Sequence, residues 1–287
     1  MALYRNFATE TDINKEYNAV LSVDDLAAYI EQDIVRSQET RRELPHFIGV
    51  QYGNTSEQTL DIFPSQDENS PVIMFIHGGY WRSLTSQDFS FVARGLVNSG
   101  FTVVLTNYNH CPKVTIPQIT VQNRTALQWV YQHCSDYSGN PQKIFVAGHS
   151  AGAQQAAMLM LECNDGTNSL SNNVIKGCIG ISGIYDLTPL MHSWLQPDLR
   201  LDKGTIADQS PLLQQNVKCA PALLLVGQDE STEFKRQSKD YADQLISEGN
   251  AAQFAEIASR NHFSVIQDLY DSNSQTSRIV KAFIEAW

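Results

Sequence analysis

The sequence lacks any long hydrophobic run. Its 287 residues are 42% hydrophobic and 18% charged, but no stretch approaches the roughly 18 consecutive apolar residues that a membrane-spanning helix needs. The first residues, MALYRNFATETD, carry no apolar core of the kind that a secretory signal has. We therefore expect a globular, cytoplasmic protein with no membrane partner.

Positive charge is also scarce. The 20 lysines and arginines are outnumbered by 31 aspartates and glutamates, the formal net charge is -11 at pH 7, and the basic residues form no cluster. Proteins bind nucleic acids and anionic membranes through basic faces, because these displace counterions. The sequence therefore predicts no nucleic-acid partner and leaves small molecules as the expected substrates.

Cysteines are few, and none occurs in a CxxC pair. There are five of them, Cys111, Cys134, Cys163, Cys178 and Cys219. An odd number of widely spaced cysteines is typical of reduced thiols in a cytosolic chain rather than of a disulfide framework. The seven histidines are scattered as well, so we expect no zinc site, no other metal and no cofactor.

From residue 71 onward, short apolar runs alternate with helical patterns. The runs expected as strands are 72–76, 101–106, 143–148, 174–182, 222–227 and 252–257, and the expected helices are 86–99, 116–134, 150–163, 232–248 and 272–287. This alternation indicates parallel strands joined by crossover helices that cover both faces of the sheet. Since no repeat or linker interrupts it, we expect one α/β domain over residues 1–287, built on a doubly wound, mostly parallel sheet.

The N-terminal helical segment, residues 1–44, contains an amphipathic pattern. Ser22 is the expected N-cap, with Asp25 three residues further on, and apolar residues follow at helical spacing at Leu26, Ile30 and Ile34. Two apolar runs come next, FIGVQY and TLDIFP, joined by the polar turn GNTSEQ. They predict two antiparallel strands before the parallel part of the sheet.

The stretch KIFVAGHSAGAQQAAMLML carries the strongest chemical signal. An apolar strand runs into Gly148-His149-Ser150-Ala151-Gly152 and then into an alanine-rich helix. Gly-x-Ser-x-Gly between a strand and a helix is a nucleophile elbow, in which the serine occupies a strained turn and the glycines avoid clashes where strand and helix cross. We therefore expect Ser150 to be a nucleophile rather than a turn serine that caps the helix.

A serine nucleophile needs a base, and in this kind of fold the histidine comes last in the chain. The histidines after Ser150 are His192 and His262. We favour His262, because it lies in the polar loop SRNHFSV after the last expected strand, whereas His192 lies inside an irregular segment.

The base in turn needs a carboxylate, expected just past the preceding strand. Asp229 and Glu230 both follow the strand 222–227, and spacing does not separate them. Asp186 is a third candidate, but we expect it to cap the turn that follows it.

The run FIHGGYWRS, residues 75–83, places glycines directly after a buried strand. Backbone N–H groups of such a loop can stabilise a developing oxyanion beside the N–H of Ala151. The loop donors expected are Gly78, Gly79 and Tyr80, whereas His77 is expected to be structural.

Residues expected to contact substrate are Tyr80, Trp81 and His149, with core packing an equal alternative for Trp81. Arg82 is expected to be solvated rather than bound to a substrate carboxylate. Residues 183–220 are irregular, with prolines at 189, 197 and 211. They follow the end of a strand, where α/β sheets hold their ligands. We expect this segment and the loop after NYNHCP to wall or cap the site.

The run His77-Gly78-Gly79-Tyr80-Trp81 resembles the HGGxW signature of arylformamidases (kynurenine formamidases), which are α/β-hydrolases related to hormone-sensitive-lipase-like esterases. Further similar stretches are NYNHCP, GHSAGA, SGIYDLTPL, GQDESTEFKRQS and NHFSV, so the likeness covers nearly the whole chain from about residue 17. The resemblance implies removal of formate from N-formyl-L-kynurenine. It also favours Glu230 over Asp229, because the family places its acid at the third position after the strand-end glycine.

Two other functions are compatible with these residues. A broad short-chain carboxylesterase would use the same serine, histidine and acid, and a non-catalytic binding protein can share the fold. A homodimer is a further open alternative for the assembly.

Overall fold

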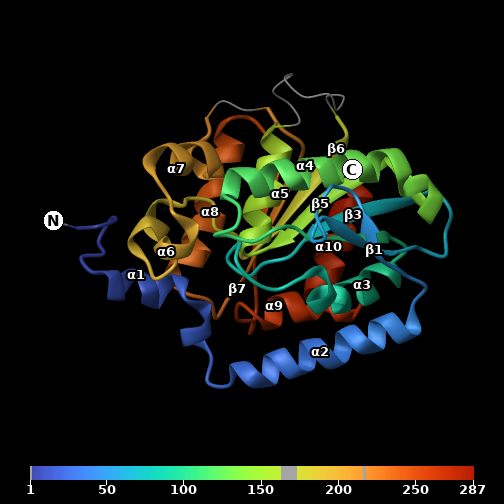
Figure 1. The fold of residues 1–287 in the computed structure, drawn as a ribbon, viewed down its shortest axis with the longest axis horizontal. Helices are drawn as coiled ribbons and strands as arrows, with labels where there is room; N and C mark the ends of the chain where they lie inside the picture. Colours follow the sequence, from blue (N-terminus) through green and yellow to red (C-terminus); the bar gives the residue numbers. More distant parts are fainter. Residues whose placement is uncertain (1, 163–172, 216–217) are drawn as a thin grey trace.

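The computed structural model describes residues 2–162, 173–215 and 218–287 (Figure 1). Within these ranges, eight strands form one sheet in the order β1-β2-β4-β3-β5-β6-β7-β8. The strands are β1 (Phe47–Gln51), β2 (Thr59–Phe63), β3 (Ser70–Ile76), β4 (Thr102–Thr106), β5 (Gly139–His149), β6 (Ile175–Ile181), β7 (Ala222–Gly227) and β8 (Ala252–Ile257). β2 is antiparallel to β1 and to β4, and the other neighbours are parallel. The predicted mostly parallel sheet with an antiparallel start is confirmed.

Helices cover both faces of the sheet, as the alternation predicts. One face carries α4 (Ile116–His133), α5 (Ala151–Glu162) and α8 (Thr232–Ser247), and the other carries α3 (Ser90–Val97), α9 (Ser264–Gln267) and α10 (Gln275–Ala286) (Figure 1). Each face has its own apolar cluster. The central strands are therefore buried on both sides, which explains why their sequences are continuous apolar runs.

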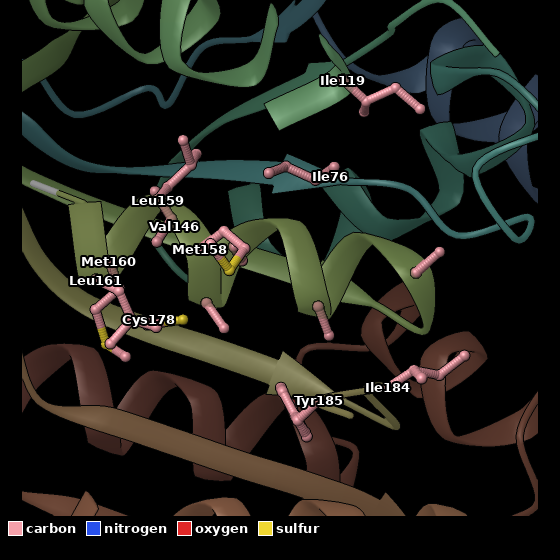
Figure 2. Packing of buried hydrophobic residues seen from close by; sticks show 14 of the residues in the cluster. Ile76, Ile119, Val146, Met158, Leu159, Met160, Leu161, Cys178, Ile184 and Tyr185 are labelled. Atoms are coloured by element: carbon pink, nitrogen blue, oxygen red, sulfur yellow. The ribbon is translucent and has the colours of Figure 1, made fainter. Parts of the chain in front are cut away.

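The β3 strand shows how one sequence supplies both clusters. Val72, Met74 and Ile76 belong to the cluster under α4, α5 and α8, whereas Ile73 and Phe75 belong to the cluster under α3 and α10. Successive side chains of a strand point to opposite faces. Figure 2 shows part of the first cluster, with Ile76 and Val146 on strands and Met158 and Leu159 on α5.

The N-terminal segment forms α1 (Glu10–Tyr17), η1 (Ala19–Ser22) and α2 (Leu26–Glu43). The predicted N-cap at Ser22 is wrong. Ser22 closes the short η1 turn by donating its hydroxyl to the carbonyl of Ala19, and Asp25 caps α2 by accepting the N–H of Ala28 at 3.1 Å. The intervening Val23 is extended, which separates the two helices.

The α2 helix lies outside α3 (Figure 1). Its apolar stripe belongs to neither of the two core clusters. Ile30 and Ile34 are 50% and 47% exposed, while the buried residues of the helix are Ser37 and Thr40. The helix is therefore amphipathic as predicted, but its apolar side faces something other than the core.

The irregular segment is described over residues 183–215 and 218–220, and the first of these two ranges forms short helical turns. They are η4 (Thr188–His192), α6 (Gln196–Leu199), α7 (Lys203–Gln209) and η5 (Pro211–Leu213). Most of its apolar side chains are buried in the first cluster, among them Ile184, Leu187, Leu190 and Leu195. The segment therefore contributes to the core on the side of α5 and α8.

Two further observations concern the helices and the cysteines of the described ranges. No helix in the described ranges is long and apolar enough to cross a bilayer. Four of the five cysteines, Cys111, Cys134, Cys178 and Cys219, are free thiols, and Cys163 lies outside the described residues.

Candidate active site

Ser150 lies at the turn between β5 and α5. Its φ is +56°, in the left-handed region that strains residues other than glycine, and its N–H donates to the carbonyl of Ile181 at 2.9 Å. A Cβ added to Gly152 would lie 2.0 Å from the carbonyl oxygen of Ile76, and one added to Gly148 would lie 2.2 Å from that of Gly152. Only glycine therefore allows the helix to cross the strand this closely, which is the geometry of a nucleophile elbow.

His262 and Glu230 meet beside this turn. The Nδ1 of His262 lies 2.7 Å from the Oε2 of Glu230, and both side chains are nearly inaccessible to solvent. The other carboxylate oxygen, Oε1, accepts the N–H of Gly227 at 2.7 Å and the hydroxyl of Ser182. Because Nδ1 faces a carboxylate, it carries the proton, and Nε2 is left as an acceptor.

The alternative residues do not join this arrangement. Asp229 is exposed and contributes its backbone N–H to the carbonyl of Arg260. His192 lies half-buried in η4 and is not a hydrogen-bond partner of Glu230. Asp186 accepts the N–H of Thr188 at 2.8 Å, so its expected role as a turn cap is confirmed.

The glycine-rich loop after β3 lies against the elbow. A Cβ on Gly78 would be 3.2 Å from the Cβ of Ser150, so the loop backbone is in contact with the serine. Gly79, Tyr80 and Trp81 have φ values of +104°, +52° and +57°. A run of three left-handed residues turns successive backbone groups away from regular structure, which is how a loop can present N–H groups to a ligand beside Ala151.

His77 supports this loop and is uncharged. Its Nδ1 donates to the carbonyl of Gly78 at 2.7 Å, and its ring stacks on that of Tyr108 with centroids 4.4 Å apart. Burial lowers the pKa of His77 to about 3. These contacts agree with the structural role expected for it.

His149 is a second neutral histidine, and it lines the active-site cavity. Its Nε2 donates to the carbonyl of His262 at 2.9 Å, and the two rings lie 4.6 Å apart. Burial lowers the pKa of His149 well below its ordinary value. The ring therefore braces His262 without placing a second positive charge beside it.

Trp81 and Arg82 are turned away from the cavity. Trp81 is fully buried and donates its indole N–H to the side-chain oxygen of Gln154 at 3.0 Å. Of its two predicted roles, core packing is the one observed, and the substrate contact is corrected. Arg82 forms an ion pair with Asp198 on α6 instead of facing the cavity.

The N-terminal segment connects the loops that carry the candidate residues. The hydroxyl of Tyr80 donates to the carbonyl of Tyr17 and accepts the N–H of Ala19. On the other side, Ser231, which follows Glu230, donates to the carbonyl of Glu16 at 2.7 Å. Sequence reasoning missed this bridge, because no local pattern marks a contact between residues so far apart in the chain.

A cavity of about 340 Å³ opens beside Ser150, His149 and His262. Its outer wall comes from the N-terminal segment, with Ala19, Val20, Leu26, Tyr29, Ile30, Asp33 and Ile34, and the remaining lining includes Leu84, Asp88, Phe89, Phe263 and Ile266. The apolar stripe of α2 therefore faces this cavity.

The wall predicted from residues 183–220 is corrected by this finding. None of the described residues 183–215 lines the cavity, nor does the loop after NYNHCP. Most apolar side chains of that segment are already buried in the first cluster, as Leu190 and Leu195 are. As for metals, no group of three or more candidate ligand side chains is placed to hold an ion anywhere in the described ranges.

The sheet order, the crossover helices and a serine on a strand-to-helix turn define an α/β-hydrolase. The family model BD-FAE matches residues 60–245. A kynurenine formamidase from Danio rerio is 30% identical over 272 residues, which are 92% of this chain and 91% of that one. The chain belongs to the kynurenine formamidase-like family of α/β-hydrolases, and it is a hydrolase.

Two further comparisons find similarity to an esterase and to a thioesterase. The esterase LipQ from Mycobacterium tuberculosis is 28% identical over 72% of this chain and 54% of its own. A structure from Silicibacter sp., described as that of a thioesterase, superposes with a TM-score of 0.82 at 24% identity, covering 94% of this chain and 98% of that one. The structural likeness supports the fold alone.

Proposed function

We propose that the protein hydrolyses an aryl formamide, such as N-formyl-L-kynurenine, to the aryl amine and formate. Ser150 is the nucleophile, His262 the base and Glu230 the acid that orients it. The observation that carries this proposal is the 2.7 Å contact between His262 and Glu230 at a cavity that Ser150 also lines. The similarity to kynurenine formamidases supports the choice of substrate.

The first half of the reaction forms a formyl-enzyme. The Nε2 of His262 takes the hydroxyl proton of Ser150 as Oγ attacks the formyl carbon, and Glu230 stabilises the imidazolium that results. The oxyanion is stabilised by backbone N–H groups of Ala151 and of the loop Gly78, Gly79 and Tyr80. His262 then gives its proton to the departing aryl nitrogen as the C–N bond breaks.

The second half releases formate. Water enters, His262 removes one of its protons, and the hydroxide adds to the formyl carbon. The bond between that carbon and the Oγ of Ser150 then breaks, and His262 gives the proton taken from water to Oγ, which restores the serine and leaves formate. An aryl amine leaves more readily than an alkyl amine because the ring stabilises its nitrogen, so a serine suffices for this amide. Phe89, Phe263 and the apolar side of α2 give the cavity the lining that an aromatic ring requires.

The free thiols of the described cysteines accord with the cytoplasmic location that we propose.

A short-chain carboxylesterase is the second candidate function. The similarity to esterase LipQ favours it, and the same serine chemistry would cleave an activated ester.

The deciding experiment compares kcat/KM for N-formyl-L-kynurenine with that for p-nitrophenyl acetate and butyrate. It uses the wild type, Ser150→Ala and, as a matched control at an exposed position, Asp229→Asn. The proposal predicts that the formamide is hydrolysed at least as efficiently as the esters by the wild type and by Asp229→Asn, and not by Ser150→Ala. Ester hydrolysis that depends on Ser150, with no turnover of the formamide, would establish the carboxylesterase instead.

A further inference from the structure

The cavity beside Ser150 is apolar but carries charge of only one sign. Among the described residues that line it, the carboxylates are Asp33 and Asp88, and no lysine or arginine is present. Asp88 already uses one carboxylate oxygen to accept the N–H of Thr85 at 2.8 Å, as part of the capping box of the short helical turn Ser86–Phe89. Asp33 has no such local role, so it is the acid whose presence calls for an explanation.

Asp33 lies on α2 among the apolar residues of the wall. One oxygen, Oδ1, accepts the side-chain N–H of Gln267 at 2.7 Å, and Oδ2 has no hydrogen-bond partner among the described residues. Asparagine would serve equally well as the acceptor for Gln267, so this contact does not require a charge. Burial raises the pKa of Asp33 to about 6, because the ionised carboxylate is less well stabilised here than in water.

None of the described charged and titratable groups around Asp33 forms an ion pair with its carboxylate. Arg36, one turn further along α2, has its guanidinium over the ring of Tyr270, 4.8 Å from the centroid, and does not line the cavity. Asp88, on the neighbouring turn, adds a second negative charge. His149, in the same cavity, is kept neutral by burial. His262 has its Nδ1 directed to Glu230.

We propose that Asp33 is a specificity residue that binds an ammonium group of the substrate, so that the enzyme prefers aryl formamides with an amine in the side chain. This inference rests on the proposed function and names the substrate class within it. An ammonium group would bind the free oxygen of Asp33 through a charge-assisted hydrogen bond. A carboxylate group of a substrate in the same place would be repelled by Asp33 and Asp88 and would meet no lysine or arginine among the described lining residues.

The test uses four probes that share a 2-formamidophenyl ketone core. Their side chains end in an amine, an amino acid, an uncharged methyl group and a carboxylic acid. For the wild type, kcat/KM is expected to be highest for the amine probe and lowest for the carboxylic acid probe. Asp33→Asn should raise KM for the amine probe about tenfold with kcat unchanged, while the uncharged probe keeps its wild-type values, which shows that the variant folds.

The matched control is Glu31→Gln, which removes the same charge from an exposed position on the same helix, outside the cavity. It should leave all four probes unchanged. The pH dependence gives an independent readout. As the pH falls through about 6, Asp33 takes up a proton, so KM for the amine probe should rise in the wild type but not in Asp33→Asn, relative to the uncharged probe.

The inference would be overturned if Asp33→Asn left unchanged the ratio of kcat/KM for the amine probe to kcat/KM for the carboxylic acid probe. Asp33 would then be only a hydrogen-bond partner of Gln267. If no formamide is hydrolysed, the proposed function fails separately. The same four side chains are then tested on aryl acetates, in which an acetoxy group replaces the formamido group. Selectivity for the amine that depends on Asp33 would still support the inference, and its absence would overturn it.

Discussion

The nucleophile elbow and the α2 helix border the same cavity but are held in place by different interactions. The elbow is fixed by backbone contacts that leave no room for a side chain, as at Gly152. α2 is attached largely by hydrogen bonds, such as that from Arg41 to the hydroxyl of Ser90 at 2.6 Å, while Ile30 and Ile34 stay half exposed. Under the proposed function, the chemistry is thus built into the sheet, and the proposed substrate selection lies on a segment that can change without disturbing it.

We expect the largest effect on catalysis from substitution of Glu230, and none from substitution of its exposed neighbour Asp229. Glu230→Gln removes the charge that stabilises the imidazolium of His262, and it should lower kcat by about 10³- to 10⁴-fold with KM little changed. Asp229→Asn, one residue away and exposed, should have wild-type kinetics. Steady-state kinetics on one substrate decides between them. If Asp229→Asn were the inactive variant, the proposed assignment would be reversed.

The rigidity of the elbow is tested at its glycines. Gly152→Ala would place a methyl group against the carbonyl of Ile76, and we expect it to destabilise the protein by about 3 kcal/mol. The matched change is Gly204→Ala in α7, where the nearest atom would be 3.5 Å away. Because alanine favours a helix, this change should stabilise the protein by about 0.5 to 1 kcal/mol. Urea denaturation measures both, and equal stability of the two variants would refute the argument from close contact.

The two candidate walls are distinguished by the smallest change in kinetics. Ile30→Ala shortens a half-exposed residue of the cavity, so it should raise KM for an aryl substrate about fivefold and hardly alter the free energy of unfolding. Leu190→Ala, in the segment predicted as the wall, empties a fully buried site and should cost about 2 to 5 kcal/mol with KM unchanged. The opposite pattern, with KM altered only by Leu190→Ala, would return the wall to residues 183–215.

The parts of the site that can be predicted from the sequence are those whose residues are contiguous in the chain. The strand, the glycine-flanked Ser150 and the crossing helix are contiguous, so their geometry follows from one motif. Spacing leaves the choice between Asp229 and Glu230 open, because both follow β7. The turn after Gly227 directs Glu230 inward, where its carboxylate accepts the N–H of that glycine.

The cavity wall is not predictable in this way, because helical periodicity identifies an apolar face without showing what it faces. Leu26 and Ile30 have the spacing of core residues, yet they line a cavity. Conversely, the prolines of 183–220 suggest an irregular wall or cap of the site, whereas leucines of this segment such as Leu190 and Leu195 are buried in the core. The bridge from Tyr80 to Tyr17 depends on tertiary contacts that no local pattern encodes.

The most direct test of the account is the crystal structure of the protein after reaction with phenylmethylsulfonyl fluoride. The account predicts a sulfonyl group on the Oγ of Ser150, its oxygen directed to the backbone of Gly79 and Ala151, and its phenyl ring against Leu26 and Ile30 of α2. A ring that packs against residues 183–215 would contradict the location of the wall, and an unmodified Ser150 would contradict its role as the nucleophile.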